Sequence, residues 1–157
     1  MNEYTPEKWI WTDADFDQMG WHDVVIHALA FDACTLSLDI DYMFRWVDPA
    51  PGETYYRFWL SPATLVFDNV SDLRLGLEPH GAPIIMNVTR SEPISGPDRA
   101  TTWQWLLDCL EGDIAFRATG YRQFTRRPPV LASVQSFPTA ERGGGSFAQI
   151  TPESTVA

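Results

Sequence analysis

The chain has few of the side chains that build most metal centres and catalytic sites. Its 157 residues include two cysteines and three histidines, without a Cys-x-x-Cys, His-Glu-x-x-His or Gly-x-Ser-x-Gly motif or a phosphate-binding glycine loop. Zinc sites use three or four such ligands, so we expect no metal and no cofactor. Because no complete catalytic set is visible, we also expect no catalytic residue.

Long apolar runs are missing as well. The longest falls short of the ~20 residues that a membrane-spanning helix needs. The opening residues lack the charged and then apolar pattern of a signal peptide. We therefore expect a cytoplasmic protein without a membrane partner, in which Cys34 and Cys109, both among apolar neighbours, are buried free thiols rather than a disulfide.

Positive charge is scarce, and Lys8 is the only lysine. The sequence has 21 acidic residues against 11 basic ones, which gives a formal net charge of −10. An acidic surface repels phosphate backbones, so we expect no nucleic-acid partner. It attracts basic proteins and speeds their encounter, so a basic protein is the partner that the charge favours.

The clearest feature present is an alternation of apolar and polar side chains between residues 34 and 46. It predicts a long β-strand with one buried face. The residues on that face are Leu36, Leu38, Ile40, Tyr42, Phe44 and Trp46. The opposite face, which we expect to be solvated, carries Ser37, Asp39, Asp41, Met43 and Arg45.

Similar alternation recurs along the chain, and no segment with helical periodicity is long enough for a βαβ unit. The further strand segments are 55–67, 70–78, 83–90, 101–112 and 113–124. Glu111-Gly112 predicts a hairpin turn, and Thr12 or Asp13 could cap a short helix near the start. We predict a mainly all-β fold, an antiparallel sandwich, roll or partly open barrel of six to eight strands.

The alternation ends at Arg126. The remaining residues hold four prolines and three consecutive glycines, a composition typical of irregular chain. We therefore predict an antiparallel β domain over 1–127 that includes the N-terminal segment. Residues 128–157 are expected to form an extended C-terminal arm, partly packed on the same domain.

The first candidate site is the segment that holds Trp21, His22, Asp23 and His27. Two histidines and an acid so close together could suggest a metal or an acid–base pair. On a strand, however, His22 and His27 are an odd number of residues apart and point to opposite faces. A hydrogen-bonded pair of His22 and Asp23 at the entry to a strand is therefore favoured.

The second candidate is the polar strand face with Asp39, Asp41 and Arg45. Paired carboxylates can divide acid and base duties, but a solvated face with an Asp–Arg pair is the favoured interpretation. Aspartate is uncommon in strands, and a binding surface would give it a purpose. The predicted binding residues are Trp21, His22, Asp23, Asp39, Asp41 and Arg45.

A group of arginines closes the alternating region. Arginine forks match carboxylate and phosphate, so this group could clamp an anion. Local neutralisation of an acidic domain is the favoured alternative. The group consists of Arg117, Arg122, Arg126 and Arg127.

Three motifs suggest a family. They are GWHDVVIHALAF at 20–31, SPATLVFDNVSDLRLGL at 61–77, and GDIAFRATGYRQFTRRPPV at 112–130 followed by ERGGGSF. Their order resembles a group of small, uncharacterised bacterial β proteins. The strand pattern and a few aromatic residues also resemble immunity proteins of bacterial toxin systems. That resemblance implies a non-catalytic protein that binds and blocks a toxin.

Two functions follow as hypotheses. The first is a non-catalytic, immunity-like module that binds a basic protein such as a toxin. The alternative is a small-ligand-binding protein or enzyme with a pocket in the curved sheet around His22, Asp23, Asp39 and Arg45. A homodimer formed through an exposed edge strand is compatible with either.

Overall fold

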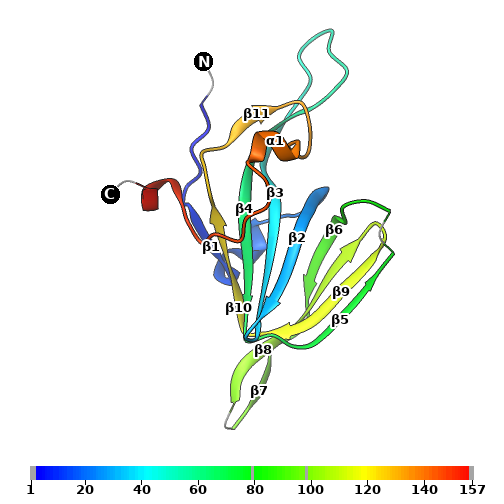
Figure 1. Cartoon of the computed structure of the whole chain (residues 1–157), viewed down its shortest axis with the longest axis vertical. Helices are drawn as coiled ribbons and strands as arrows, with labels where there is room; N and C mark the ends of the chain where they lie inside the picture. Colours follow the sequence, from blue (N-terminus) through cyan, green and yellow to red (C-terminus); the bar gives the residue numbers. More distant parts are fainter. Residues whose placement is uncertain (1–2, 79, 98, 156–157) are drawn as a thin grey trace.

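The computed structural model describes residues 3–78, 80–97 and 99–155, and it is dominated by antiparallel β-structure (Figure 1). The strands of this described part are β1 (Ile10–Thr12), β2 (Val24–Asp32), β3 (Thr35–Val47), β4 (Arg57–Asp68), β5 (Ser71–Leu77), β6 (Ile84–Arg90), β7 (Ile94–Gly96), β8 (Arg99–Cys109), β9 (Gly112–Ala118), β10 (Gly120–Thr125) and β11 (Val130–Ala132). The helical elements are η1 (Asp13–Gln18), α1 (Thr139–Arg142) and η2 (Pro152–Thr155). The predicted fold class is confirmed.

The strands form one open sheet in the order β1-β10-β4-β3-β2-β6-β8-β9-β5, so the sheet is not closed into a barrel. Two further strands lie off this path, since β11 pairs with β4 and β7 pairs with β8. In the described part of the chain, β1, β7 and β11 have three residues each. Strands this short carry too little alternation to be read from sequence, which explains why the observed number exceeds the expected six to eight.

Strand β2 connects the two halves of the sheet. Its first residues, Val24 and Val25, pair with β6, and the remainder from Ile26 onward pairs with β3. The sheet bends here, so β4, β3 and β2 lie on one side and β6, β9 and β5 on the other (Figure 1). The core fills the space between them: the ring of Phe67 on β4 lies 5.3 Å from Trp105 on β8.

The long strand predicted between residues 34 and 46 is β3. Leu36, Leu38 and Ile40 are fully buried, as the alternation predicts. A β-bulge between Met43 and Arg45 then shifts the register against β4. The extra residue turns the following side chains over, so the prediction for Trp46, which is 43% exposed, is wrong.

The predicted hairpin at Glu111-Gly112 is confirmed, and it joins β8 to β9. Gly112 has a φ of 132°, a conformation that side chains rarely adopt. A Cβ at this position would lie 1.9 Å from the carbonyl oxygen of Gly76 on β5. The glycine therefore lets the hairpin lie directly against its neighbouring strand.

The two cysteines occupy different environments. Both are free thiols, and Cys109 is buried in the core, where burial raises the pKa of its thiol to about 11. Cys34 is exposed, so the prediction of a buried thiol is wrong for this residue. It lies in the two-residue turn between β2 and β3, and its apolar sequence neighbours belong to the strand ends.

The predicted short helix near the start of the chain is confirmed as η1. It follows Thr12, whose backbone N–H donates to Asp15 Oδ2 at 2.9 Å. None of the helices in the described part is long and apolar enough to cross a membrane.

The segment after Arg127 is packed against the sheet rather than fully extended. Val130–Ala132 forms β11 and pairs with Phe58–Leu60 on β4, beyond the end of β10. Helix α1 follows and lies close to β3 in Figure 1. Phe137, just before this helix, is buried. This segment covers the outer face of β3, so that the two aspartate side chains of this face are buried.

Candidate functional site

The first predicted binding residue, Trp21, belongs to the core. Its side chain is buried, and its Nε1–H donates to Gln123 Oε1 at 2.9 Å. The ring packs edge-on against Tyr121, with 5.6 Å between the centroids. These contacts give Trp21 a structural role, and no surface of it is free to contact a partner.

His22 and Asp23 lie in the turn before β2. The His22 ring Nδ1 is 3.0 Å from the carbonyl oxygen of Met86. Its Nε2 lies 3.6 Å from Asp23 Oδ2, which is too long for a hydrogen bond. Asp23 instead accepts a hydrogen bond of 3.1 Å from Gln135 Nε2. The expected hydrogen-bonded pair is therefore not formed, because each residue has a closer partner elsewhere.

Asp39 and Asp41 are fully buried, so the predicted solvated strand face is wrong. They share a face of β3, as the alternation predicts, but the C-terminal segment covers that face. Around them lie Arg142 from this segment, Arg126 directly after β10 and His27 from β2. We call these five residues the buried charge network.

Asp39 receives hydrogen bonds on both carboxylate oxygens. Arg142 Nη1 donates to Oδ2 at 2.6 Å, and Arg126 Nη2 donates to Oδ1 at 2.8 Å. The backbone N–H of Ser146 donates to Oδ2 at 2.9 Å. Both arginine side chains are themselves buried, so these are charge-assisted bonds in a water-poor environment.

Asp41 is paired in the same way. Arg142 Nη2 donates to Oδ1 at 2.9 Å, so the guanidinium of Arg142 bridges Asp39 and Asp41. On Oδ2, Asp41 accepts the backbone N–H of Phe137 at 2.7 Å and lies 2.8 Å from His27 Nε2. Arg142 therefore connects the C-terminal segment to two positions of β3.

Both aspartates remain ionised in this environment. Burial alone would raise the pKa of Asp39, but the hydrogen bonds from Arg142 and Arg126 outweigh it and lower the pKa below 3.8. For Asp41, burial is likewise outweighed by His27 and Arg142. Two carboxylates and two guanidinium groups balance in charge. Every carboxylate oxygen has a partner, so the network fixes the C-terminal segment and offers no free base.

Arg45, the last predicted binding residue, is separated from the aspartates by the bulge in β3. It is exposed and lines a shallow cavity of about 590 Å³ together with Trp46 and Asp48. None of His22, Asp23 and Asp39 lines that cavity. The structure therefore does not bring the six predicted residues together, and the pocket expected around four of them is not formed by these described residues.

A surface that sequence reasoning missed lies beyond Arg45. The connection from β3 to β4 projects from the end of the sheet (Figure 1). Tyr55 and Tyr56 of this connection are 82% and 46% exposed, and Trp46 at the end of β3 is 43% exposed. We call these three residues, with the exposed Asp48 and Glu53, the aromatic tip. The Tyr-Tyr dipeptide is the signal in the sequence, but the alternation places it in the predicted strand 55–67, whereas β4 begins only at Arg57.

The arginine group is divided by the structure. Arg122 binds both carboxylate oxygens of Asp68, at 3.1 and 2.9 Å, and Arg126 belongs to the buried charge network. The guanidinium of Arg127 lies over the ring of Phe137, 5.0 Å from its centroid. These three arginines are occupied by internal contacts.

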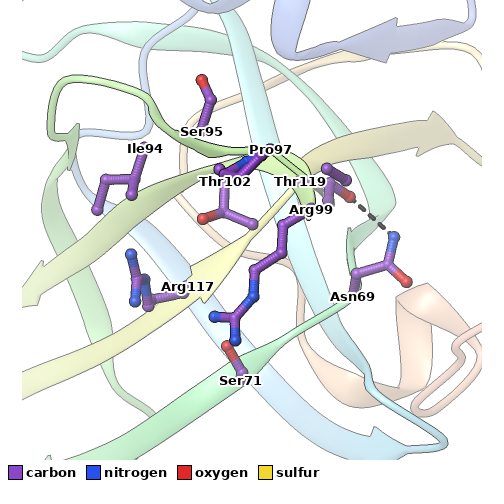
Figure 2. Close-up of a pocket in the computed structure, with 11 residues that line it drawn as sticks. Asn69, Ser71, Ile94, Ser95, Pro97, Arg99, Thr102, Arg117 and Thr119 are labelled. Atoms are coloured by element: carbon purple, nitrogen blue, oxygen red, sulfur yellow. Dashed lines mark hydrogen bonds between the residues drawn. The ribbon is translucent and has the colours of Figure 1, made fainter.

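Arg117, the fourth member, lines a cavity of about 820 Å³ beside the hairpin of β7 and β8 (Figure 2). Its walls come from that hairpin, from β9 and from the chain that enters β5. The residues that line it are Asn69, Ser71, Ile94, Ser95, Gly96, Pro97, Arg99, Ala100, Thr102, Arg117 and Thr119.

Comparisons with protein-family models, with curated proteins and with solved structures found no match to the chain. The resemblance to small bacterial β proteins and to toxin-immunity proteins therefore stays a hypothesis.

Proposed function

We propose that this protein is a non-catalytic binding module whose aromatic tip docks on a basic protein, in the manner of an immunity protein on a toxin. The observation that carries the proposal is the exposure of Trp46, Tyr55 and Tyr56 at the end of a projecting hairpin. Large aromatic side chains of this kind dominate the energetics of protein interfaces.

The aromatic tip is ordered by contacts within the hairpin. The Trp46 ring packs edge-on against Tyr56 and Phe58, with centroids 5.8 and 5.1 Å away. The backbone N–H of Glu53 donates to the carbonyl of Ala50 at 2.8 Å, which closes the turn. A preorganised surface loses little conformational entropy when it binds, so these contacts favour docking without a large rearrangement.

Charge supports a basic partner. Asp48 and Glu53 belong to the aromatic tip, and the exposed Glu3 lines the adjoining cavity. The chain as a whole has a net charge of −10. An acidic protein attracts a basic one over several ångströms and raises the association rate, and this steering weakens as salt increases.

The buried charge network argues against catalysis at the residues most suited to it. Asp39 and Asp41 are the paired carboxylates of the sequence, and all their oxygens accept hydrogen bonds inside the protein. A general base needs a lone pair within reach of substrate. The structure therefore gives these aspartates a structural task, and a binding role is favoured for the protein.

The test is a search for a basic partner, followed by its dissection. Candidate toxin genes next to the native gene are coexpressed with this protein, and binding of the purified partner is measured at two salt concentrations. We expect the Tyr55→Ala/Tyr56→Ala variant to weaken binding at least about tenfold, which corresponds to roughly 1.4 kcal/mol.

The matched control is Phe31→Ala, because Phe31 is 52% exposed but lies at the end of β2, outside the aromatic tip. This variant is expected to bind as the parent protein does. The proposal is overturned when no basic protein is retained. It is also overturned when the tip variant and the control bind equally well.

A further inference from the structure

The cavity beside the β7–β8 hairpin has a positive lining in an acidic protein. Arg99 and Arg117 contribute two guanidinium groups, and none of the described residues that line the cavity is acidic. Figure 2 shows the side chain of Arg99 extending toward Ser71 on the opposite wall. With a net charge of −10 on the chain, such a local reversal of charge marks a place where an anion would be preferred over a cation.

Within the described ranges, the side chains of Arg99 and Arg117 form no hydrogen bond or ion pair with another residue. The contrast is with Arg122, Arg126 and Arg142, which all bind carboxylates. The N–H donors of a guanidinium group match the oxygens of a carboxylate or a phosphate. Guanidinium groups without a partner in a cavity therefore favour binding of an oxyanion.

Arg117 also has a buried donor without a partner. Its Nε is inaccessible to solvent and makes no hydrogen bond among the described residues. A buried donor without a hydrogen-bond partner is energetically unfavourable. Arg117 is held in place by β9, where it lies opposite Gln104 on β8 and Ser71 on β5. The described residues therefore leave the guanidinium of Arg117 incompletely satisfied.

The rest of the lining suits an organic molecule rather than a bare ion. The volume of about 820 Å³ is within the range of small-molecule sites. Ser71 and Thr102 supply hydroxyl groups, while Ile94, Pro97 and Ala100 supply apolar contact. The oxyanion would lie at the arginines, and the carbon body of the ligand would lie against the apolar side chains.

We infer that this cavity binds a small organic anion that carries a carboxylate or a phosphate. This site differs in position from the one expected from sequence, and it is independent of the aromatic tip. It adds a ligand-binding function to the proposed protein-binding one.

The inference is tested by titration followed through the backbone amide resonances of ¹⁵N-labelled protein. The probes are phenyl phosphate and phenylacetate, and 2-phenylethanol is the uncharged control. We expect saturable shifts at residues 94–97, 99–102 and 117 with a Kd on the order of 1 mM or tighter for at least one anion. The anion that binds more tightly identifies the phosphate or the carboxylate as the preferred group.

Two variants locate the binding. Arg117→Gln is expected to weaken the affinity for the anion at least about tenfold. Arg74→Gln makes the same charge change on neighbouring β5 at an exposed residue that does not line the cavity, and it should bind as the parent does. Arg99→Gln on the hairpin gives a second reading if Arg117→Gln is unfolded by circular dichroism.

Three results would overturn the inference. One is the absence of a saturable shift with either anion. Another is equal binding of 2-phenylethanol, which would indicate an apolar groove without charge recognition. The last is equal loss of affinity in Arg117→Gln and Arg74→Gln, which would indicate a general effect of net charge.

Discussion

Arg142 Nη1 donates a hydrogen bond of 2.6 Å to Asp39 Oδ2, although 103 positions separate the two residues in the chain. Both side chains are almost fully buried, at 1% and 0% exposed. The same guanidinium also binds Asp41. The outer face of β3 is therefore an internal interface, and its integrity depends on a residue that belongs to no strand.

Replacing Arg142 by methionine should destabilise the protein strongly. Asp39 and Asp41 would stay buried with Arg126 as the one remaining arginine of the network, and an uncompensated buried charge costs about 3–5 kcal/mol. Urea unfolding followed by tryptophan fluorescence measures the loss. The control is Arg122→Gln, which removes a partly exposed pair with Asp68 and should cost less than about 1 kcal/mol. Similar losses in both variants would refute the role given to Arg142.

Acid should release the C-terminal segment. Burial would raise the pKa values of Asp39 and Asp41, but hydrogen bonds from His27, from the arginines and from the backbone outweigh it and hold both pKa values below the usual aspartate value. Groups with a depressed pKa stabilise the fold above their unfolded value, and the contribution is lost as the pH falls through the folded value. Stability should therefore be constant above about pH 5 and fall steeply below about pH 4.

The measurement is the free energy of unfolding between neutral and acidic pH for the parent and for Asp39→Asn. The variant should be less stable at neutral pH, and its stability should depend less on pH in the acidic range, because one of the two groups no longer titrates. A parent protein that becomes more stable on acidification would contradict the assignment.

The turn between β2 and β3 is open to stabilisation. Ala33 and Cys34 have φ values of 46° and 66°, both in the left-handed region. Such a conformation costs an ordinary side chain about 1–2 kcal/mol, while Asn-Gly adopts it readily in two-residue hairpins. The Ala33→Asn/Cys34→Gly variant should gain about 1–2 kcal/mol in urea unfolding. Cys34→Ser, which keeps the strain, should change stability by less than about 0.5 kcal/mol.

The sequence predicted the fold class because alternation is a local property. Leu36, Leu38 and Ile40 are buried on one face of β3, and the hairpin at Gly112 forms where the pattern predicts it. Alternation also shows that Asp39 and Asp41 share a face. It cannot show what covers that face, because the covering residue Arg142 lies in a stretch with no repeat.

The candidate sites were harder to predict for a similar reason. The cavity combines Ser71, Arg99 and Arg117 from three separated parts of the chain, and no short stretch of sequence contains more than one of them. The bulge after Met43 also moved Arg45 away from the aspartates. A single inserted residue of this kind leaves no trace in the composition, yet it decided which side chains share a surface.

The long sequence separation within the buried charge network also has a consequence for how the molecule forms. Strands β1 and β10 pair across most of the chain, and Arg142 meets Asp39 and Asp41 only when the last elements arrive. Folds rich in such distant pairings fold slowly, in milliseconds to seconds. Until the C-terminal segment docks, the two carboxylates remain hydrated, so the final dehydration of β3 should be a late step on the folding pathway.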